Sequence, residues 1–393
     1  MEEEYDLEYA CYPIGDSYWS MADLLRWFTG DEHKVGNMSR MSDIHMKVGR
    51  PFSYRYDDDL EQMEEAYPLT AETIEYLIFP MLNETNRRKL KYEGLNDLDC
   101  GFAWDEGGVN FRINIFHDRE GMAMVMRMLS SYVPAVKDVG FPSENIWKSM
   151  VSMKQGLCLV TGVTGSGKST TIASLIEHIN KTRKVRIITL EDPVEFVFES
   201  KTAMISQREV GGSVDSFSKG LKSALRENPD IIFIGEMRDQ ETAGLALSAA
   251  ETGHLVFSTL HTRDTKGAIS RIIDMFPSEQ AKALALQLSF SIGTIISQKL
   301  IKREDGKGRV VAMEILRNTN ALGNVIRTMN LSQVYSMLET QKKEGMQTME
   351  QHLVELYVDG TISYENALGN ANDMSILDQL EEYEEDEEDE YED

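Results

Sequence analysis

Four stretches in the middle of the chain are unbroken apolar runs, each about as long as one β-strand. They are GLCLVTG, VRIITL, DIIFIG and HLVFSTL, and segments with a helical pattern separate them. Strands of a parallel sheet are covered on both faces, so their sequences lack the alternation of half-exposed strands. The pattern therefore predicts an α/β domain over residues 147–377, with a mostly parallel sheet and crossover helices.

The segment before residue 133 has a different pattern. Apolar and polar residues alternate in SDIHMKVG and FSYRY, and CGFAW and VNFRINIF flank the turn-rich DEGG. This alternation is typical of antiparallel strands, and the DEGG break predicts a hairpin. SMADLLRWF and AETIEYLIFPMLNETNRRKL have helical patterns, the second with one proline break. We expect a small α+β domain over residues 19–132.

Three further segments differ in composition. Residues 1–18 are acidic and aromatic and form an N-terminal extension, and residues 133–146, with Pro134, Gly140 and Pro142, are the linker candidate. From about residue 276 the pattern is mainly helical, and AKALALQLSFSIGTIISQKL is typical of a buried helix. Residues 378–393 form an acidic tail that we expect to stay solvated.

The chain has 393 residues, enough for two domains, and a formal net charge of −26. The last thirteen residues carry eleven negative charges, and the remainder of the chain is acidic as well. Since such a surface repels phosphate groups, we expect no nucleic-acid partner. The three cysteines form no CxxC pair, which argues against a disulfide framework and a four-cysteine zinc site.

The N-terminus lacks the basic and apolar regions of a signal peptide. No stretch approaches the roughly 18 consecutive apolar residues of a membrane-spanning helix. The sequence thus predicts a soluble cytoplasmic protein without membrane insertion.

One glycine-rich stretch carries the clearest chemical signal. GVTGSGKST fits the pattern G-x-x-x-x-G-K-[ST] and lies between the apolar strand LCLVT and the helical pattern TTIASLIEHIN. In this arrangement backbone N–H groups and a helix N-terminus surround phosphate oxygens. Lys168 is placed to reach the β- and γ-phosphates of ATP, and the Ser169 hydroxyl to ligate Mg²⁺. The predicted phosphate site consists of Gly162, Val163, Thr164, Gly165, Ser166, Gly167, Lys168, Ser169 and Thr170.

Ionisable residues follow the three other predicted strands. IITL ends in Glu191 and Asp192, IIFIG in Glu236, and LVFSTL in His261. Ligands of an open α/β sheet bind at the carboxyl ends of its strands, so we expect one shared site beside the phosphate loop. Hydrolysis of ATP needs a metal ligand and a group that activates water. Glu236 is the candidate metal ligand and Glu191 the candidate base, with Asp192 as an alternative, and these roles remain interchangeable.

Two of the seven histidines stand at the ends of one apolar run, HLVFSTLH. His254 and His261 are separated by roughly 23 Å if the run is an extended strand. They cannot share one metal ion, which argues against a zinc site. His261 lies at the predicted active edge, where it is placed to sense the γ-phosphate. Geometry alone favours a structural role for His254.

Together these motifs resemble those of the type IV pilus retraction ATPases, a family of secretion-type hexameric P-loop motors. GVTGSGKST resembles their Walker A motif, ITLEDPVEF their aspartate box, ALRENPDIIFIGEMRD their Walker B region and AAETGHLVFSTLHT their histidine box. SDIHMKVGRPF and FRINIF resemble parts of their N-terminal domain. The resemblance covers about residues 38–375. It implies a PAS-like domain joined to a RecA-like P-loop ATPase domain with a helical C-terminal region.

The resemblance also implies activity and partners. It implies a homo-hexamer that hydrolyses ATP with Mg²⁺ to retract type IV pili, which serves twitching motility and DNA uptake. The ring would act at the inner-membrane pilus platform protein, alone or with a paralogous retraction ATPase. The family's arginine fingers lie on N-terminal strands, where Arg112 and Arg127 match best and Arg119 matches less well. Both His254 and His261 belong to the family's histidine box, which adds a catalytic role for His254.

One segment departs from the family pattern. Retraction motors carry an AIRNLIRE-like segment where this chain has ALGNVIRT, with Gly323 for the first arginine, Thr328 for the final glutamate, and Arg327 retained. An accessory ATPase that modifies a partner ring is therefore an alternative. The others are an assembly or secretion ATPase of the same superfamily and a nucleic-acid motor. Assembly and secretion ATPases usually have a CxxC…CxxC zinc element, which this sequence lacks. The acidic charge disfavours a nucleic-acid motor.

Overall fold

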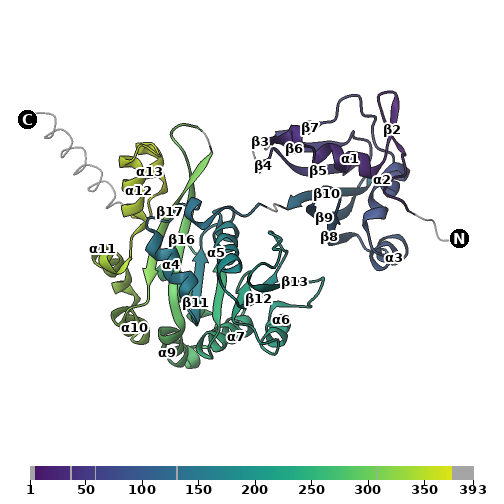
Figure 1. Cartoon of the computed structure of the whole chain (residues 1–393). Coiled ribbons are helices and arrows are strands. Elements are labelled where there is room, and N and C mark those ends of the chain that lie inside the picture. The colour runs from purple at the N-terminus through teal and green to yellow at the C-terminus, as the bar shows by residue number, and fades with distance from the viewer. Residues whose placement is uncertain (1–4, 36–37, 58, 130–131, 307, 374–393) are drawn as a thin grey trace, which may run out of the picture. The chain divides into compact units, whose positions relative to one another are not determined.

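The computed structural model describes residues 5–35, 38–57, 59–129, 132–306 and 308–373, which fall into two compact units (Figure 1). The first unit ends at Tyr132 and includes Glu195–Val197. The second comprises Val133–Val194 and continues from Phe198. The acidic tail expected over residues 378–393 lies outside the described residues.

An antiparallel sheet with the strand order β7-β6-β5-β10-β9-β8 forms the first unit. The predicted hairpin is confirmed, since β8 pairs antiparallel with β9 from Trp104 and Val109 onward. Alternation sends Ile44 and Met46 of β5 into the core beneath the sheet. The strands are β5 (Met41–Lys47), β6 (Ser53–Tyr56), β7 (Asp59–Gln62), β8 (Asp97–Trp104), β9 (Val109–Asp118) and β10 (Gly121–Leu129).

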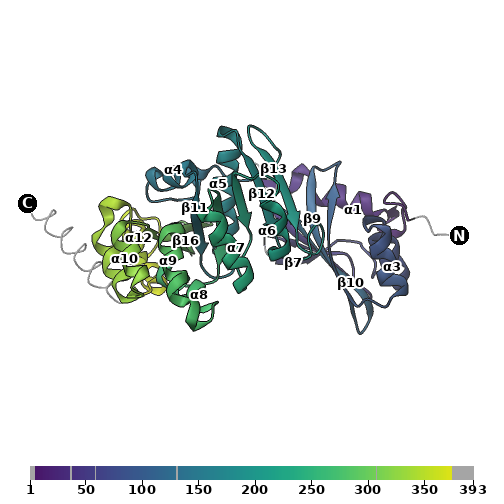
Figure 2. The same cartoon turned by 90° about the horizontal axis from the view of Figure 1, so that it is seen from below.

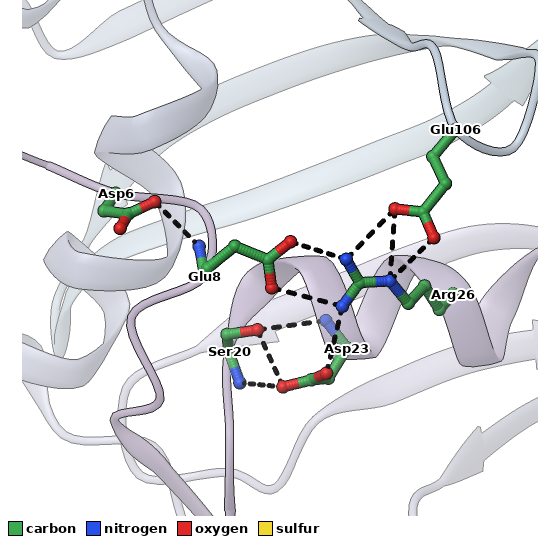
Figure 3. Close-up of polar contacts among 6 residues, drawn as sticks. All are labelled: Asp6, Glu8, Ser20, Asp23, Arg26 and Glu106. Carbon is green, nitrogen blue, oxygen red and sulfur yellow. Dashed lines mark hydrogen bonds and ion pairs between the residues drawn. The ribbon is translucent and has the colours of Figure 1, made fainter.

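Short helices and two small hairpins complete this unit. The predicted helices are confirmed, and the proline break falls in a 3-10 turn, η2 (Phe79–Met81). The N-cap of α1 is Ser20, which forms a capping box with Asp23 (Figure 3). The other elements are β1 (Tyr12–Ile14), β2 (Ser17–Trp19), α1 (Met21–Phe28), η1 (Asp31–His33), β3 (Lys34–Val35), β4 (Met38–Ser39), α2 (Ala71–Ile78) and α3 (Glu84–Tyr92).

The described part of the N-terminal extension, residues 5–18, packs within the first unit. Tyr12 is fully buried, and its hydroxyl donates to the carbonyl oxygen of Tyr67 at 2.7 Å. The guanidinium of Arg26 in α1 lies between the carboxylates of Glu8, from the extension, and Glu106, from the β8–β9 turn (Figure 3). These contacts tie the extension to a helix and a hairpin that are distant in sequence.

The second unit is built on a sheet with the order β13-β12-β14-β15-β11-β16-β17. Each neighbouring pair is parallel except β16–β17, which is antiparallel. This confirms the predicted, mostly parallel sheet. The strands are β11 (Gly156–Thr161), β12 (Arg186–Glu191), β13 (Met204–Glu209), β14 (Ile231–Ile234), β15 (Leu255–Leu260), β16 (Ile292–Lys302) and β17 (Arg309–Arg317).

Helices cover both faces of this sheet. Leu157 and Leu159 of β11 belong to one core with α6 to α11, whereas Cys158 and Val160 pack with α4 and α5. Figure 2 shows α5 on one side of the sheet and α7 on the other. The helices are η3 (Val136–Asp138), α4 (Glu144–Ser152), α5 (Lys168–Thr182), α6 (Phe217–Ala224), α7 (Gln240–Glu251), α8 (Thr265–Asp274), η4 (Ser278–Gln280), α9 (Ala281–Ser291), α10 (Asn320–Arg327), η5 (Leu331–Gln333), α11 (Val334–Thr340), η6 (Lys342–Glu344), α12 (Met349–Val358) and α13 (Tyr364–Asn370).

The prediction of a single buried helix over AKALALQLSFSIGTIISQKL is wrong. Only Ala281–Ser291 is helical, and Ile292–Lys302 forms β16 between β11 and β17. Its isoleucine and threonine residues are branched at Cβ and favour extended backbone. A short apolar run does not by itself distinguish a buried helix from a buried strand. The next strand, Arg309–Arg317, was also not expected in this mainly helical region.

The linker candidate is partly structured. Val136 is 5% exposed and belongs to a core of the second unit, and α4 begins at Glu144. Part of the proline- and glycine-containing segment is therefore an element of that fold. Across the described ranges, no helix combines the length and apolar character that crossing a membrane requires.

Candidate functional site

The phosphate loop connects β11 to α5, whose first residue is Lys168. Gly162, Gly165 and Gly167 have φ angles of 144°, 78° and 86°, which glycine adopts without the steric cost of a side chain. A Cβ on Gly162 would lie 2.4 Å from the carbonyl oxygen of Gln298. Backbone conformation therefore favours glycine at all three positions, and at Gly162 the close carbonyl oxygen also leaves no room for a side chain.

Lys168 is held over the loop. Its side chain is 8% exposed, and its Nζ donates to the carbonyl oxygens of Gly162 at 3.0 Å and Val163 at 3.1 Å. The N-cap of α5 is Gly167, which offers no side-chain cap to the first N–H groups of the helix. These N–H groups and the adjacent ammonium form the kind of site that binds an anion at a helix N-terminus.

A buried glutamine of β16 contacts the phosphate loop and the first turn of α5. Gln298 is 1% exposed, its Nε2 donates to the carbonyl oxygen of Ser166 at 2.6 Å, and its Oε1 accepts from the Thr171 hydroxyl at 3.0 Å. The parallel register of β11 and β16 pairs Thr161 with Ser297 and so brings Gln298 beside the loop. Gln298 was not among the residues expected from the sequence, because this segment had been assigned to a helix.

Glu191 is the last residue of β12 and is 6% exposed. Its Oε1 accepts hydrogen bonds from the Thr189 hydroxyl at 2.6 Å and from Gln207 Nε2 at 3.1 Å. Gln207 lies opposite Thr189 on the neighbouring strand β13. These two donors fix the carboxylate at the end of its strand. Gln207 was not expected as a site residue, and only the pairing of β12 with β13 reveals its role.

Glu236 and His261 meet beyond the ends of β14 and β15. Glu236 Oε2 accepts a hydrogen bond from Arg238 Nε at 2.7 Å, and Glu236 Oε1 lies 3.5 Å from His261 Nε2. Arg238 Nη1 also donates to Asp192 Oδ2 at 3.3 Å. The hydrogen bond with Glu236 raises the pKa of Arg238 above its ordinary value, so the guanidinium is charged. Arg238 was not expected, although it stands two residues after Glu236 in the GEMRD sequence.

The strand order β12-β14-β15-β11 places these groups at one edge of the sheet. β12, β14, β15 and β11 are parallel neighbours, so their carboxyl ends point the same way. Asp192, Glu236 and His261 therefore stand on the edge from which the phosphate loop begins. This is the arrangement in which an open α/β sheet binds its ligand.

His254 lies in the turn before β15, at the opposite end of that strand from His261. Its Nδ1 is 3.0 Å from the carbonyl oxygen of Ala249, in the last turn of α7. The structure therefore does not bring His254 to Glu236 and His261. Within the part of the chain that the structure describes, no group of three or more His, Cys, Asp and Glu side chains could hold a metal ion.

The donor set suits Mg²⁺ bound together with a nucleotide. Mg²⁺ at such sites takes one or two protein oxygens and fills its remaining positions with phosphate oxygens and water. Ser169 in the first turn of α5 and Glu236 after β14 are oxygen donors on the two segments that border the site. A cage of several carboxylates is not needed for this chemistry.

The arginines singled out from the sequence belong to the first unit. Arg112 of β9 and Arg127 of β10 lie opposite each other in the strand register, and Arg119 lies in the turn between these strands. Arg127 Nε donates to Oδ1 of Asp43 at 2.7 Å; the Arg127 side chain is 65% exposed, and that of Asp43 is 4% exposed. Arg112 Nη2 lies 3.8 Å from Asp99 Oδ1. Both arginines thus face carboxylates of their own sheet.

Residues 39–369 match the family model described as Type II/IV secretion system protein. The chain is 42% identical over 327 residues to the type IV pilus retraction ATPase PilT of Pseudomonas aeruginosa, which covers 83% of this chain and 93% of that protein. It is 43% identical over 300 residues to a twitching motility protein of Neisseria gonorrhoeae, and the match covers 76% of this chain and 79% of that protein. It is 34% identical over 343 residues to the type IV pilus ATPase PilU of Pseudomonas aeruginosa, covering 86% and 88%.

Solved structures of ATPases also match this chain over most of its length. The crystal structure of the pilus retraction motor PilT with bound ADP matches with a TM-score of 0.82 and 40% identity, over 91% of this chain and 98% of that one. The ATPase DotB of Legionella pneumophila matches with a TM-score of 0.72 and 26% identity, over 84% and 90%. The match to PilT confirms the α/β fold class expected from the sequence.

Proposed function

The chain belongs to the type II/IV secretion system protein family, and on that premise we propose that it is a hexameric ATPase motor that powers type IV pilus retraction. One observation supports this above all: the phosphate loop and the ionisable residues of three strands stand on one edge of a parallel sheet. Two relatives whose matches cover more than four fifths of this chain are named as a type IV pilus retraction ATPase and a type IV pilus ATPase. The activity proposed is hydrolysis of ATP to ADP and phosphate.

The phosphate loop would bind the nucleotide. Its backbone N–H groups and Lys168 Nζ would contact the phosphate oxygens and reduce their mutual repulsion. Mg²⁺, held by Ser169 and Glu236, supplies further positive charge to the β- and γ-phosphates when it is bound. Glu191 is the proposed base that orients or deprotonates the attacking water, with Asp192 as the alternative. The two hydrogen bonds that fix the Glu191 carboxylate favour the first assignment.

The remaining site residues have proposed supporting roles. His261 would sense the γ-phosphate through its contact with Glu236. Arg112 and Arg127 are the proposed arginine fingers, because a guanidinium can neutralise charge that develops on the transferred phosphoryl group. His254 remains a proposed member of the histidine box at the other end of β15.

The motor would work as a homo-hexamer on the cytoplasmic side of the inner-membrane pilus platform protein. A PAS-like first unit and a RecA-like second unit are the proposed domain identities. A paralogous retraction ATPase is a further proposed partner. The extension, residues 1–18, and the tail, residues 378–393, have no assigned role in this proposal.

A non-autonomous accessory ATPase is the second candidate, and α10 carries the observation that favours it. Gly323, where retraction motors have arginine, is buried where α10 packs against α9, and a Cβ there would lie 3.5 Å from the Ser289 carbonyl oxygen. Arg327 is retained and its guanidinium lies 5.8 Å from the centre of the Phe290 ring. The departure at Gly323 therefore affects the contact between α10 and α9, and the departure at Thr328 changes an exposed position.

ATP turnover by the purified chain tests these proposals. Wild type would be measured beside Lys168→Ala, Glu236→Gln and, as a matched control, Lys184→Ala, an exposed lysine beyond the far end of α5. Gel filtration at the same concentration reports assembly. Turnover by a hexamer that both site variants lose and the control retains would support an autonomous motor. Nucleotide binding without turnover would contradict it and favour the accessory ATPase, which addition of a partner ATPase would then test.

A further inference from the structure

Two adjacent side chains of β16 reach two distant parts of the second unit. Gln298 contacts the phosphate loop, and Lys299 contacts the last residue of α13 and the described residues that follow it, Asn370–Asp373, which we call the C-terminal strap. Lys299 Nζ donates to the carbonyl oxygen of Asn370 at 2.7 Å and to Oδ1 of Asn372 at 2.6 Å. Neighbouring residues of one strand thus hold the loop and the strap.

The strap is also fixed from its other side. Glu350 of α12 is fully buried and accepts hydrogen bonds from the backbone N–H groups of Asn372 at 2.7 Å and Asp373 at 3.0 Å. The strap therefore has a defined position between α12 and Lys299. A rearrangement of the strap would leave a buried carboxylate and a half-buried ammonium without these partners, which is energetically costly.

The strap and the phosphate loop face one cavity. This cavity has a volume of about 430 Å³, and its lining includes Gly162 and Val163 of the loop, Asn372 of the strap, and the pair Gln298 and Lys299 between them. Gln298 and Lys299, two consecutive residues of β16, thus connect the loop side of the cavity to the strap side.

The contact of Gln298 bears on how the loop binds anions. Successive N–H groups converge on a phosphate only while the carbonyl oxygens between them point away from it. Gln298 Nε2 donates a hydrogen bond to the Ser166 carbonyl oxygen at 2.6 Å and so holds this oxygen on the β16 side, and its Oε1 accepts from the Thr171 hydroxyl in the first turn of α5. One buried side chain therefore holds the loop in the shape that phosphate binding needs.

We propose that Gln298 is a positioning residue of the phosphate loop, and that Lys299 links it to the C-terminal strap, so that nucleotide affinity depends on the strap. The inference rests on the proposed function, since it requires that the loop binds a nucleotide. Neither side chain is assigned a contact with the reacting atoms. Gln298 acts through the backbone position of Ser166 in the loop, and Lys299 acts through its neighbour Gln298.

Binding of Mg²⁺ and a fluorescent ADP analogue to the full-length protein tests the first half of the proposal. Gln298→Met keeps the length of the side chain but removes both hydrogen bonds, and we expect a dissociation constant about 10-fold to 100-fold higher. Thr171→Val removes one of the two contacts and should give a smaller increase, whereas Thr171→Ser retains the hydroxyl and should bind as wild type does. Melting temperatures are recorded alongside, because a merely structural role would lower them and leave the affinity of the folded protein unchanged.

Lys299→Met tests the link to the strap, with Lys302→Met, an exposed lysine of the same strand, as the matched control. We expect weaker ADP binding by Lys299→Met and unchanged binding by the control. Coupling is reciprocal, so ADP should slow hydrogen exchange in a peptide covering the strap in wild type and not in Gln298→Met.

The outcomes separate the inference from the function on which it rests. If wild type fails to bind ADP, the proposed function is wrong. If wild type binds ADP and both Gln298→Met and Lys299→Met bind it equally well, the inference is wrong. A loss in Gln298→Met without a loss in Lys299→Met would overturn the link to the strap. If Gln298→Met fails to fold, the ADP affinity of Thr171→Val decides the role of the glutamine. Affinity equal to that of Thr171→Ser would then contradict the proposal.

Discussion

A buried carboxyl group in the second unit gives a quantitative test of the fold. Glu314 of β17 is 2% exposed and accepts hydrogen bonds from the backbone N–H and the hydroxyl of Thr265, the first residue of α8, at 2.7 Å each. Burial raises the pKa of Glu314 from 4.5 to about 7. The nearby charges of Asp264 and Glu350 act in the same direction, and the two hydrogen bonds oppose it.

The sign of the effect on stability follows from proton binding. Between pH 4.5 and pH 7 the folded protein keeps the Glu314 proton that the unfolded chain has released. The free energy of unfolding therefore decreases as the pH rises through this interval. One pKa unit corresponds to about 1.4 kcal/mol, so this group alone lowers the free energy of unfolding by about 3 kcal/mol between pH 4.5 and pH 8.

Glu314→Gln removes this dependence, since glutamine keeps the size and an acceptor oxygen for Thr265 but cannot ionise. We expect variant and wild type to differ by a constant packing offset at pH 5, and the variant to gain about 3 kcal/mol on wild type by pH 8. Hydrogen exchange of peptides covering β17 and α8 measures the difference. Side-by-side samples at each pH cancel the pH dependence of intrinsic exchange. Glu339→Gln, at an exposed position of α11, is the matched control.

A difference between Glu314→Gln and wild type that stays constant from pH 5 to pH 8 would refute this reasoning. It would mean that Glu314 ionises at the same pH in the folded and unfolded protein. A difference that falls with increasing pH would contradict the sign, and so the claim that burial dominates the environment of this carboxyl group.

Three further predictions concern other buried or paired groups. Burial lowers the pKa of His352 from 6.5 to about 4, so this group alone should raise the free energy of unfolding by about 3 kcal/mol from pH 4 to pH 7, opposite in sign to the contribution of Glu314. His352→Gln should lose this rise in the same exchange assay. Gly162→Ala should add on the order of 1–3 kcal/mol of backbone strain and a clash with the Gln298 carbonyl oxygen; wild-type ADP binding and melting temperature would contradict this. Arg238→Ala should change the free energy of unfolding by less than about 1 kcal/mol, because the side chain is exposed. It should lower ATP turnover at least about 10-fold through the loss of charge beside Glu236, and unchanged turnover would exclude that role.

Local patterns made several elements predictable. The glycine-rich loop could be recognised because its conformation depends on the φ angles of its own residues and on the helix that follows it. The four central strands could be recognised because burial on both faces leaves an unbroken apolar run. The β8–β9 hairpin could be recognised because its turn and its two alternating strands are contiguous. In each case the signal lies within one contiguous segment of the chain.

The strand β16 is an element that local sequence patterns do not predict. Its residues follow an apolar helix without a break, and its Cβ-branched residues favour extended backbone without determining that the helix ends before Ile292. That choice depends on β11 and β17, which supply the hydrogen-bond partners of the strand. Since β11 lies more than a hundred positions earlier, no local window contains the information.

The sequence by itself determined the α/β class, the phosphate loop and the set of ionisable residues at the strand ends, because each depends on contiguous residues. Only the tertiary structure decided which side chains hold these groups in place. Gln298 and Ser166 are 132 positions apart, and Gln207 and Glu191 lie on different strands. Arg238 follows β14 and forms a hydrogen bond with Asp192 at the end of β12. Their contacts follow from the order of strands in the sheet. That order depends on how distant segments pack together. The loss of chain entropy on bringing these segments together is offset only when the complete core has formed.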